Sequence, residues 1–179
     1  MKRISIFLIL LYVSLPAFSQ IYTTRTGRIS FYSSTEKENI NAVNNQVYAV
    51  IDADKKNIAF ALLMKSFQFE KELMQEHFNE NYAESDKYPK ASFTGAYTGD
   101  VNVAKDGVYN VTVKGNLTIH NTTKNVEEPA TFEVKNGVLI GKTKFAVKPE
   151  DYAISIPSLV REKIAKEITI DVSITCSPK

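Results

Sequence analysis

The amino-acid sequence predicts an all-β protein in which about eight antiparallel strands close into an up-and-down barrel. Apolar and polar residues alternate strictly over 109–120, which is typical of a strand with one face on a core and one in water. The dipeptides Asp106–Gly107 and Asn136–Gly137 can supply the positive φ that tight hairpins need. Because nearly every connection is local, we expect a barrel rather than a two-sheet sandwich, which would need crossing connections.

The expected strands follow one another along the chain. Residues 91–148 are predicted to form a four-stranded meander, in which 121–124 is a polar connection between two strands. With no repeat or linker in the sequence, we expect a single domain over 20–179. The remaining strands are expected at 28–33, 46–53, 57–66 and 167–176.

Two segments interrupt the strand pattern. The first has apolar residues at helical spacing and is expected to end before Pro89, because the residue preceding a proline is pushed out of helical geometry. We expect this segment to cover the barrel as a lid. In the second segment, Ser158 is the expected N-cap of a short helix over 159–166. The lid is predicted to turn Leu73, Met74, His77 and Phe78 inward and Glu72, Glu76 and Glu80 toward water.

Residues 1–19 are predicted to be a secretory signal peptide. Lys2 and Arg3 precede an apolar run that is too short to span a bilayer, and Ala17 and Ser19 have the spacing of a signal-peptidase site. Removal of this segment leaves 20 basic and 20 acidic residues, so nothing indicates a nucleic-acid partner. We therefore expect an exported protein, periplasmic or secreted, with no transmembrane segment in its mature chain.

The sequence predicts neither a catalytic nor a metal site. His77 and His120 have no second histidine or carboxylate at ligand spacing. We expect His77 to pack on the apolar side of the helix and His120 to lie near solvent. Cys176 shares the parity of the apolar residues of the last strand, so we interpret it as a small buried residue. With no nucleophile elbow or phosphate loop, we expect a protein that is not an enzyme and needs no cofactor.

The remaining candidate site is apolar. Glycines interrupt the predicted inward faces, where they either relieve the coiling strain of a small barrel or leave volume for a ligand. The residues alone favour strain. The glycines are Gly95, Gly99, Gly115 and Gly141. The candidates for lining an apolar cavity are Phe60, Leu62, Met64, Phe67, Leu73, Met74, Phe78, Phe93, Tyr97, Leu117, Ile119, Phe132 and Phe145.

Two blocks of sequence resemble the YceI family of bacterial exported proteins. The first is KYP at 87–89 with ASF at 91–93, following a helical segment. The second is GNLTIH at 115–120 with TTK at 122–124. The order and spacing of these blocks match the family, and the resemblance extends from about residue 27 to residue 176.

The resemblance implies a lipocalin-like barrel that encloses a long apolar ligand of the polyisoprenoid or isoprenoid-quinone type, in the periplasm or secreted, without catalysis. Asn121 stands where the family usually has glycine. Tyr88, Tyr97 and His120 are candidates for polar contacts near the barrel mouth. The resemblance favours a cavity, whereas the alternative is a filled barrel that serves as a protein interaction module through the glutamate face. The two hypotheses differ in whether the barrel contains a continuous cavity.

Overall fold

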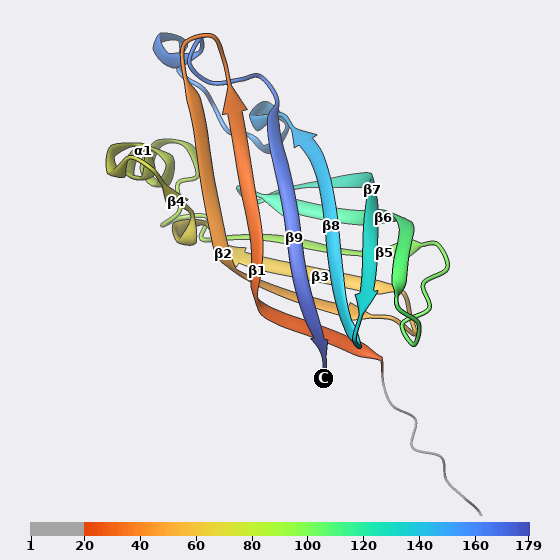
Figure 1. The fold of residues 1–179 in the computed structure, drawn as a ribbon. Helices are drawn as coiled ribbons and strands as arrows, with labels where there is room; N and C mark the ends of the chain where they lie inside the picture. The colour runs from red at the N-terminus through yellow and green to blue at the C-terminus, as the bar shows by residue number, and fades with distance from the viewer. Residues whose placement is uncertain (1–19) are drawn as a thin grey trace, which may run out of the picture.

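The computed structural model describes residues 20–179, which form a β-barrel (Figure 1). The predicted signal peptide, residues 1–19, lies outside the described residues. The strands are β1 (Ile21–Ser34), β2 (Asn39–Asp52), β3 (Asn57–Leu63), β4 (Gln68–Phe69), β5 (Lys90–Thr98), β6 (Gly107–Ile119), β7 (Thr122–Lys135), β8 (Val138–Val147) and β9 (Ile168–Pro178). The helical elements are α1 (Glu72–His77), the π-helical turn η2 (Phe78–Tyr82) and the 3₁₀ turns η1 (Met64–Ser66), η3 (Pro149–Tyr152) and η4 (Ser158–Val160).

Eight of these strands close into an antiparallel ring. Their order is β1-β9-β8-β7-β6-β5-β3-β2, and the pairing of β1 with β2 closes the barrel. The two-residue strand β4 only extends the sheet beside β2. Strands β1 and β2 form a long hairpin and exceed the predicted ranges 28–33 and 46–53 (Figure 1). The predicted up-and-down barrel is confirmed, because ring closure is made by antiparallel neighbours throughout.

Two tight turns connect the strands of the meander. Asn136 and Gly137 join β7 to β8 as predicted, with φ of 51° and 76°. His120 and Asn121 join β6 to β7 in the same way, with φ of 49° and 58°. Asparagine and histidine adopt this left-handed conformation more readily than most side chains, so the turn forms without a glycine. The connection predicted at 121–124 is therefore shorter than expected, since β7 already begins at its second residue.

The connection between β5 and β6 differs from the prediction. Asp106–Gly107 does not form a two-residue hairpin, because it ends a longer loop over 99–106. The glycine that follows β5 has a φ of 120°, which takes the chain out of the ladder. Val101 and Val103 lie in this loop and pack against the barrel core.

The helical segments are shorter than predicted. The first contains only α1 and η2 and reaches Pro89 through turns. In the second, Ser158 caps no helix, and 159–166 contains only part of the 3₁₀ turn η4. Val160 and Ile164 of this segment contact a cavity in the barrel. Burial of these apolar side chains outweighs a helix propensity worth only tenths of a kcal/mol per residue, about 0.7 at most.

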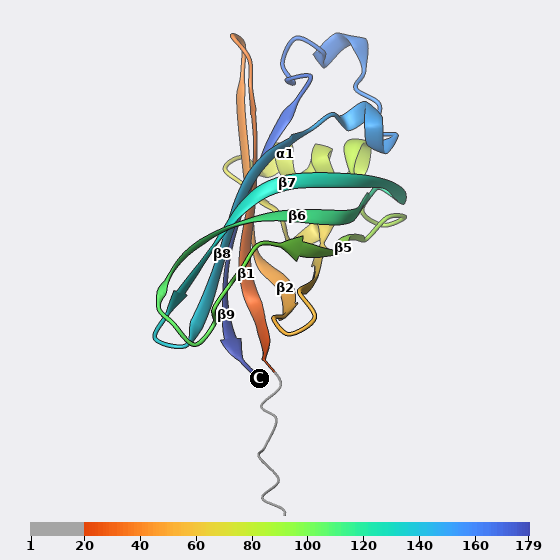
Figure 2. The same cartoon turned by 90° about the vertical axis from the view of Figure 1, so that its right-hand side faces the viewer.

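The barrel is filled at one end and hollow at the other. At the end near the C-terminus, Ile51, Leu139, Ile174 and Cys176 are each at most 1% exposed and belong to one apolar cluster. Two segments cover the opposite end (Figure 2). We call α1 with η2 the cover and residues 149–166 the strap. Both segments therefore cover the hollow end of the barrel.

Candidate functional site

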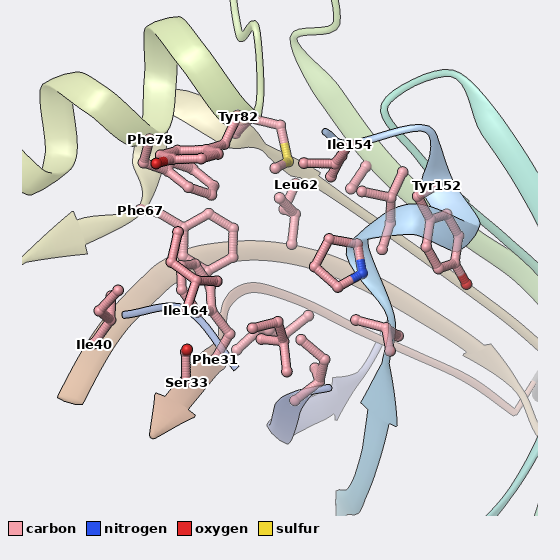
Figure 3. A pocket seen from close by; sticks show the side chains of 18 of the residues that line it. Phe31, Ser33, Ile40, Leu62, Phe67, Phe78, Tyr82, Tyr152, Ile154 and Ile164 are labelled. Atoms are coloured by element: carbon pink, nitrogen blue, oxygen red, sulfur yellow. The ribbon is translucent and has the colours of Figure 1, made fainter. Parts of the chain in front are cut away.

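An apolar cavity of about 590 Å³ occupies the hollow end of the barrel (Figure 3). All eight barrel strands contribute inward-facing side chains to its wall, and the cover and the strap complete it. The volume falls within the range of about 300–1,000 Å³ that is typical of small-molecule sites. Because the wall is largely apolar, the arrangement can desolvate a hydrophobic ligand but offers little for chemistry on it.

Most of the predicted cavity residues lie together in this wall. All thirteen candidates except Tyr97 and Phe132 line the cavity. These two face inward but lie at the filled end, where their ring centroids are 5.0 Å apart and the Tyr97 hydroxyl donates to the Ala53 carbonyl at 3.4 Å. The alternation of the sequence thus indicated the inward side of each strand, but not the depth at which the barrel becomes hollow.

An aromatic cluster attaches the cover to the barrel. The Phe78 ring on η2 has centroid distances of 5.4 Å to Phe31, 5.7 Å to Phe67 and 5.1 Å to Phe69. Aromatic pairs at such spacings contribute about 0.5–1.5 kcal/mol each beyond the area that they bury. Phe31 and Phe69 were not among the sequence candidates, although both line the cavity. Phe31 lies within the predicted strand 28–33, whereas Phe69 belongs to the two-residue strand β4, which the sequence did not predict.

The cover is oriented largely as predicted. Leu73, Met74, His77 and Phe78 all line the cavity, whereas Glu72, Glu76 and Glu80 are exposed. Leu73 is nevertheless 61% exposed and His77 is also exposed, so these two side chains lie at the rim. His77 thus lies on the apolar side of the helix as predicted, but it is exposed and is not the packed residue that we expected. The helix is only six residues long, and its last turn leaves this side chain at the edge of the wall.

The strap is the part of the wall that sequence reasoning missed. Its apolar side chains line the cavity. One hydrogen bond and one ion pair hold it to the β1–β2 hairpin. The Ala165 amide donates to the Ser33 hydroxyl at 2.9 Å, and Lys37 pairs with Glu162. The available signal was the alternation of Tyr152, Ile154 and Ile156, which are separated by the small residues Ala153 and Ser155. The apolar and aromatic lining residues of the strap are Pro149, Tyr152, Ile154, Ile156, Val160 and Ile164.

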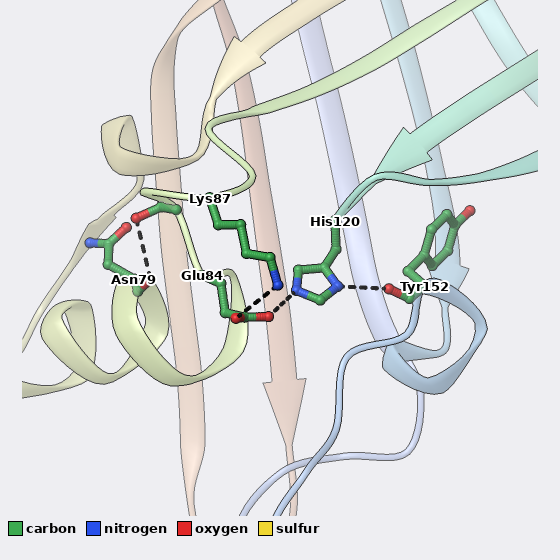
Figure 4. Close-up of polar contacts among 6 residues, drawn as sticks. Asn79, Glu84, Lys87, His120 and Tyr152 are labelled. Carbon is green, nitrogen blue, oxygen red and sulfur yellow. Dashed lines mark hydrogen bonds and ion pairs between the residues drawn. The ribbon is translucent and has the colours of Figure 1, made fainter.

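His120 links the cover to the strap at their bases (Figure 4). Its Nδ1 donates to the Tyr152 carbonyl at 3.2 Å, and its Nε2 lies 2.8 Å from Glu84 Oε2. The carbonyl can only accept, so Nδ1 is the donor in the first contact. The Tyr88 ring packs edge-on against the His120 ring, with the two ring centroids 4.2 Å apart. The side chain is 8% exposed, so the prediction that His120 lies near solvent is wrong.

The polar contacts expected at the mouth are supplied by other residues. Tyr88, Tyr97 and His120 do not line the cavity. The rings of Tyr88 and His120 pack against each other, and Tyr97 lies at the filled end. Lys71 and Lys163 are exposed at the rim. The acidic and basic side chains that line the cavity are Glu38, Lys71, His77, Glu128 and Lys163, of which only Glu128 belongs to a barrel strand.

The inward glycines allow close packing and do not enlarge the cavity. Gly95 and Gly115 are opposite each other on β5 and β6. A Cβ at Gly95 would lie 2.2 Å from the Lys114 carbonyl and 2.8 Å from the Phe93 ring. A Cβ at Gly141 would crowd Ile174 at the filled end. The space above the glycine pair is thus occupied by an aromatic ring, which supports the strain interpretation.

The described residues contain few other sites. Within 20–179, no group of three histidine, cysteine, aspartate or glutamate side chains is placed to hold a metal ion. Among the helices of that range, none has the length and apolar character to cross a bilayer. Cys176 is fully buried as predicted, and burial raises the pKa of its thiol to about 11.

Comparison with known proteins places the chain among barrels of one family. The YceI-like domain matches residues 16–176, whereas the sequence matches no curated protein. A polyisoprenoid binding domain from Saccharophagus degradans implicated in plant cell wall breakdown is 13% identical, with a TM-score of 0.77 over 90% of this chain and 99% of that one. BcnA of Burkholderia cenocepacia is 15% identical, with a TM-score of 0.71 over 84% and 96%. The YCEI protein of Campylobacter jejuni is 16% identical, with a TM-score of 0.59 over 100% and 99%. With the barrel, its cover and the match over nearly the whole chain, the protein belongs to the YceI-like family.

Proposed function

We propose that this protein binds a long apolar ligand of the isoprenoid or isoprenoid-quinone type inside the barrel and carries it without chemical change. The observation that carries the proposal is the apolar cavity of about 590 Å³ between the filled end, the cover and the strap. The similarity of the fold to a polyisoprenoid binding domain supports this choice of ligand class. The alternative, a filled barrel that serves as a protein interaction module, is the weaker hypothesis, because it gives the cavity no function.

The binding energy would come from removing the ligand from water. Burial of apolar surface contributes about 25 cal/mol per Å², or about 0.8 kcal/mol for each methylene group. A branched isoprenoid chain presents many such groups to a wall formed by Phe60, Leu62, Phe93, Leu117 and Phe145. Part of this gain is offset by loss of translational and chain freedom, so affinity is expected to rise with chain length until the cavity is full.

The direct test is organic extraction of the purified protein followed by mass spectrometry. We expect an isoprenoid lipid that co-purifies in stoichiometric amount. Leu62→Trp places a large side chain in the cavity and should abolish retention, because Leu62 lines the wall and is 9% exposed. Leu63→Trp is the matched control, since Leu63 is the next residue and is 48% exposed. Equal lipid content in the two variants, or no lipid in the wild-type protein, would contradict the proposal.

We also propose that the chain acts outside the cytoplasm, on the basis of the signal-peptide pattern in residues 1–19. The expected mature protein begins at Gln20. Expression of the full chain in a Gram-negative host, followed by osmotic-shock fractionation and intact-mass measurement, tests this. A protein that stays in the cytoplasmic fraction with residues 2–19 attached would contradict it.

A further inference from the structure

Glu128 occupies an unusual position in the cavity wall. It follows the inward parity of Val126, Ala130 and Phe132 on β7, and it lines the cavity. Val113 lies opposite it on β6, so its nearest cross-strand neighbour is apolar. Glu128 is half-buried, and a carboxylate that faces an apolar cavity loses part of its hydration, which is unfavourable unless a group there uses the charge or the acceptor.

Glu128 also marks the floor of the cavity. Along β7 the wall ends at Glu128, because Ala130 and Phe132 are part of the filled core and do not line the cavity. Thr143 is the corresponding last residue on β8, where Gly141 already packs against Ile174 of the core. Thr143 is opposite Ala130, the next inward residue after Glu128 on β7, so the two polar side chains lie one inward position apart at the end of a largely apolar space.

Both side chains offer acceptors rather than donors. The Thr143 hydroxyl donates its proton to the Pro129 carbonyl at 2.8 Å, so its free lone pairs can only accept. Among residues 20–179, no ion pair or side-chain hydrogen bond satisfies Glu128, in contrast to its outward neighbour Glu127, which pairs with Lys114 at 2.8 Å. A group that enters the floor of the cavity thus meets acceptors without a compensating cation.

We propose that Glu128, with Thr143, forms a head-group site that selects an isoprenoid whose polar end is a hydrogen-bond donor, such as a hydroxyl or an amine. An anionic head, such as a phosphate, is rejected there because it would bring like charge against an unpaired carboxylate. The head enters first and reaches the floor, and the tail extends toward the aromatic cluster at the cover. This inference rests on the proposed function, since it assigns the orientation of a ligand in the same cavity.

A competing explanation comes from the strand pairing. The β7–β8 ladder ends at Ala130 and Thr143, so the part of β7 that holds Glu128 pairs only with β6. Figures 1 and 2 show this part of β7 running with β6 away from β8. If water reaches the Glu128 carboxylate between β7 and β8, the carboxylate is simply hydrated and would not distinguish among the polar heads of ligands. The two explanations therefore differ in head-group selectivity.

The experiment uses three probes with the same tail: farnesol, farnesylamine and farnesyl phosphate. Each displaces the fluorescent apolar probe N-phenyl-1-naphthylamine from the delipidated protein. We expect farnesol and farnesylamine to bind at least about tenfold more tightly than farnesyl phosphate. Glu128→Gln keeps the shape but removes the charge, and should reduce the preference over the phosphate to about threefold or less. Glu127→Gln is the matched control, because the same change on the outward face should keep the wild-type preference.

The outcomes separate the two proposals. If the wild-type protein binds all three probes equally, or if Glu128→Gln and Glu127→Gln retain the same preference, the head-group site is overturned while lipid binding stands. If none of the probes displaces the dye and no lipid is extracted, the proposed function fails and this inference fails with it. A preference that is lost only in Glu128→Gln supports the site.

Discussion

His120 Nε2 lies 2.8 Å from Glu84 Oε2, and this contact joins two segments that the sequence keeps 36 residues apart. Glu84 follows the cover, with a φ of 41°, and His120 begins the turn between β6 and β7. Through Nδ1 the same ring holds the Tyr152 carbonyl at the base of the strap. One imidazole thus contacts both the end of the cover and the base of the strap.

Replacement of this imidazole should weaken the mouth of the barrel. His120→Ala leaves the Tyr152 carbonyl without its side-chain partner and removes one of the two partners of the Glu84 carboxylate, which keeps Lys87 at 3.9 Å, so we expect the free energy of unfolding to fall by about 1–3 kcal/mol. Urea denaturation measures the change. His77→Ala is the control, since His77 is exposed and its replacement should change stability by less than about 0.5 kcal/mol. Similar losses in both variants would show that the His120 contacts contribute nothing specific.

The aromatic cluster should determine how firmly the cover is attached. Phe78→Ala removes the ring that contacts Phe31, Phe67 and Phe69. We expect amide hydrogen exchange to become faster in 72–82, while the barrel strands keep their protection, because local opening depends on the apolar contacts of the segment itself. Mass spectrometry of peptides from the exchanged protein tests this. Uniformly faster exchange over the whole chain would mean that the cover is not a separate unit.

The glycine pair should tolerate no side chain. In Gly115→Ala the new Cβ would lie 2.4 Å from the Thr94 carbonyl and 2.6 Å from the Gly95 Cα, both backbone atoms that cannot move aside cheaply. We expect a loss of about 1–3 kcal/mol in the free energy of unfolding. In the control Gly107→Ala, the nearest atom is the Tyr109 hydroxyl at 3.5 Å, and stability should stay close to wild type. Thermal or urea unfolding of the two variants gives the comparison.

The buried thiol predicts how stability depends on pH. Burial raises the pKa of Cys176 from 9.0 to about 11. Between these values the unfolded chain releases the proton while the folded protein keeps it, so the free energy of unfolding falls as pH rises through this range and is unaffected by this group below it. The fall is on the order of 2–3 kcal/mol. Burial raises the pKa of Tyr97 and Tyr152 as well, and these tyrosines act in the same direction.

Cys176→Ala isolates the contribution of the thiol. Urea unfolding between about pH 8 and about pH 10.5 should give a shallower decline for this variant than for the wild-type protein, because only the tyrosines then remain. Parallel declines would show that the thiol does not titrate differently in the two states.

Several features of the protein could be predicted from the sequence. The alternation over 109–120 specified β6 and its inward face, because a period of two allows only one face to reach a core. Asn136–Gly137 specified the β7–β8 hairpin, since the conformation that such a turn needs is local to its two residues. The parity of Cys176 predicted its burial for the same reason. Each of these depends on neighbours in the chain.

Other features were decided only by the tertiary structure. Tyr97 and Phe132 share the parity of the cavity residues, yet they fill the barrel, because depth along the barrel depends on the register of all eight strands. His120 is buried because Glu84 and Tyr152 approach it from segments distant in sequence. No local pattern contains these distances. The sequence therefore determined which side chains face inward, whereas ring closure, with its register, determined where the interior is filled, where it is hollow and which residues close it.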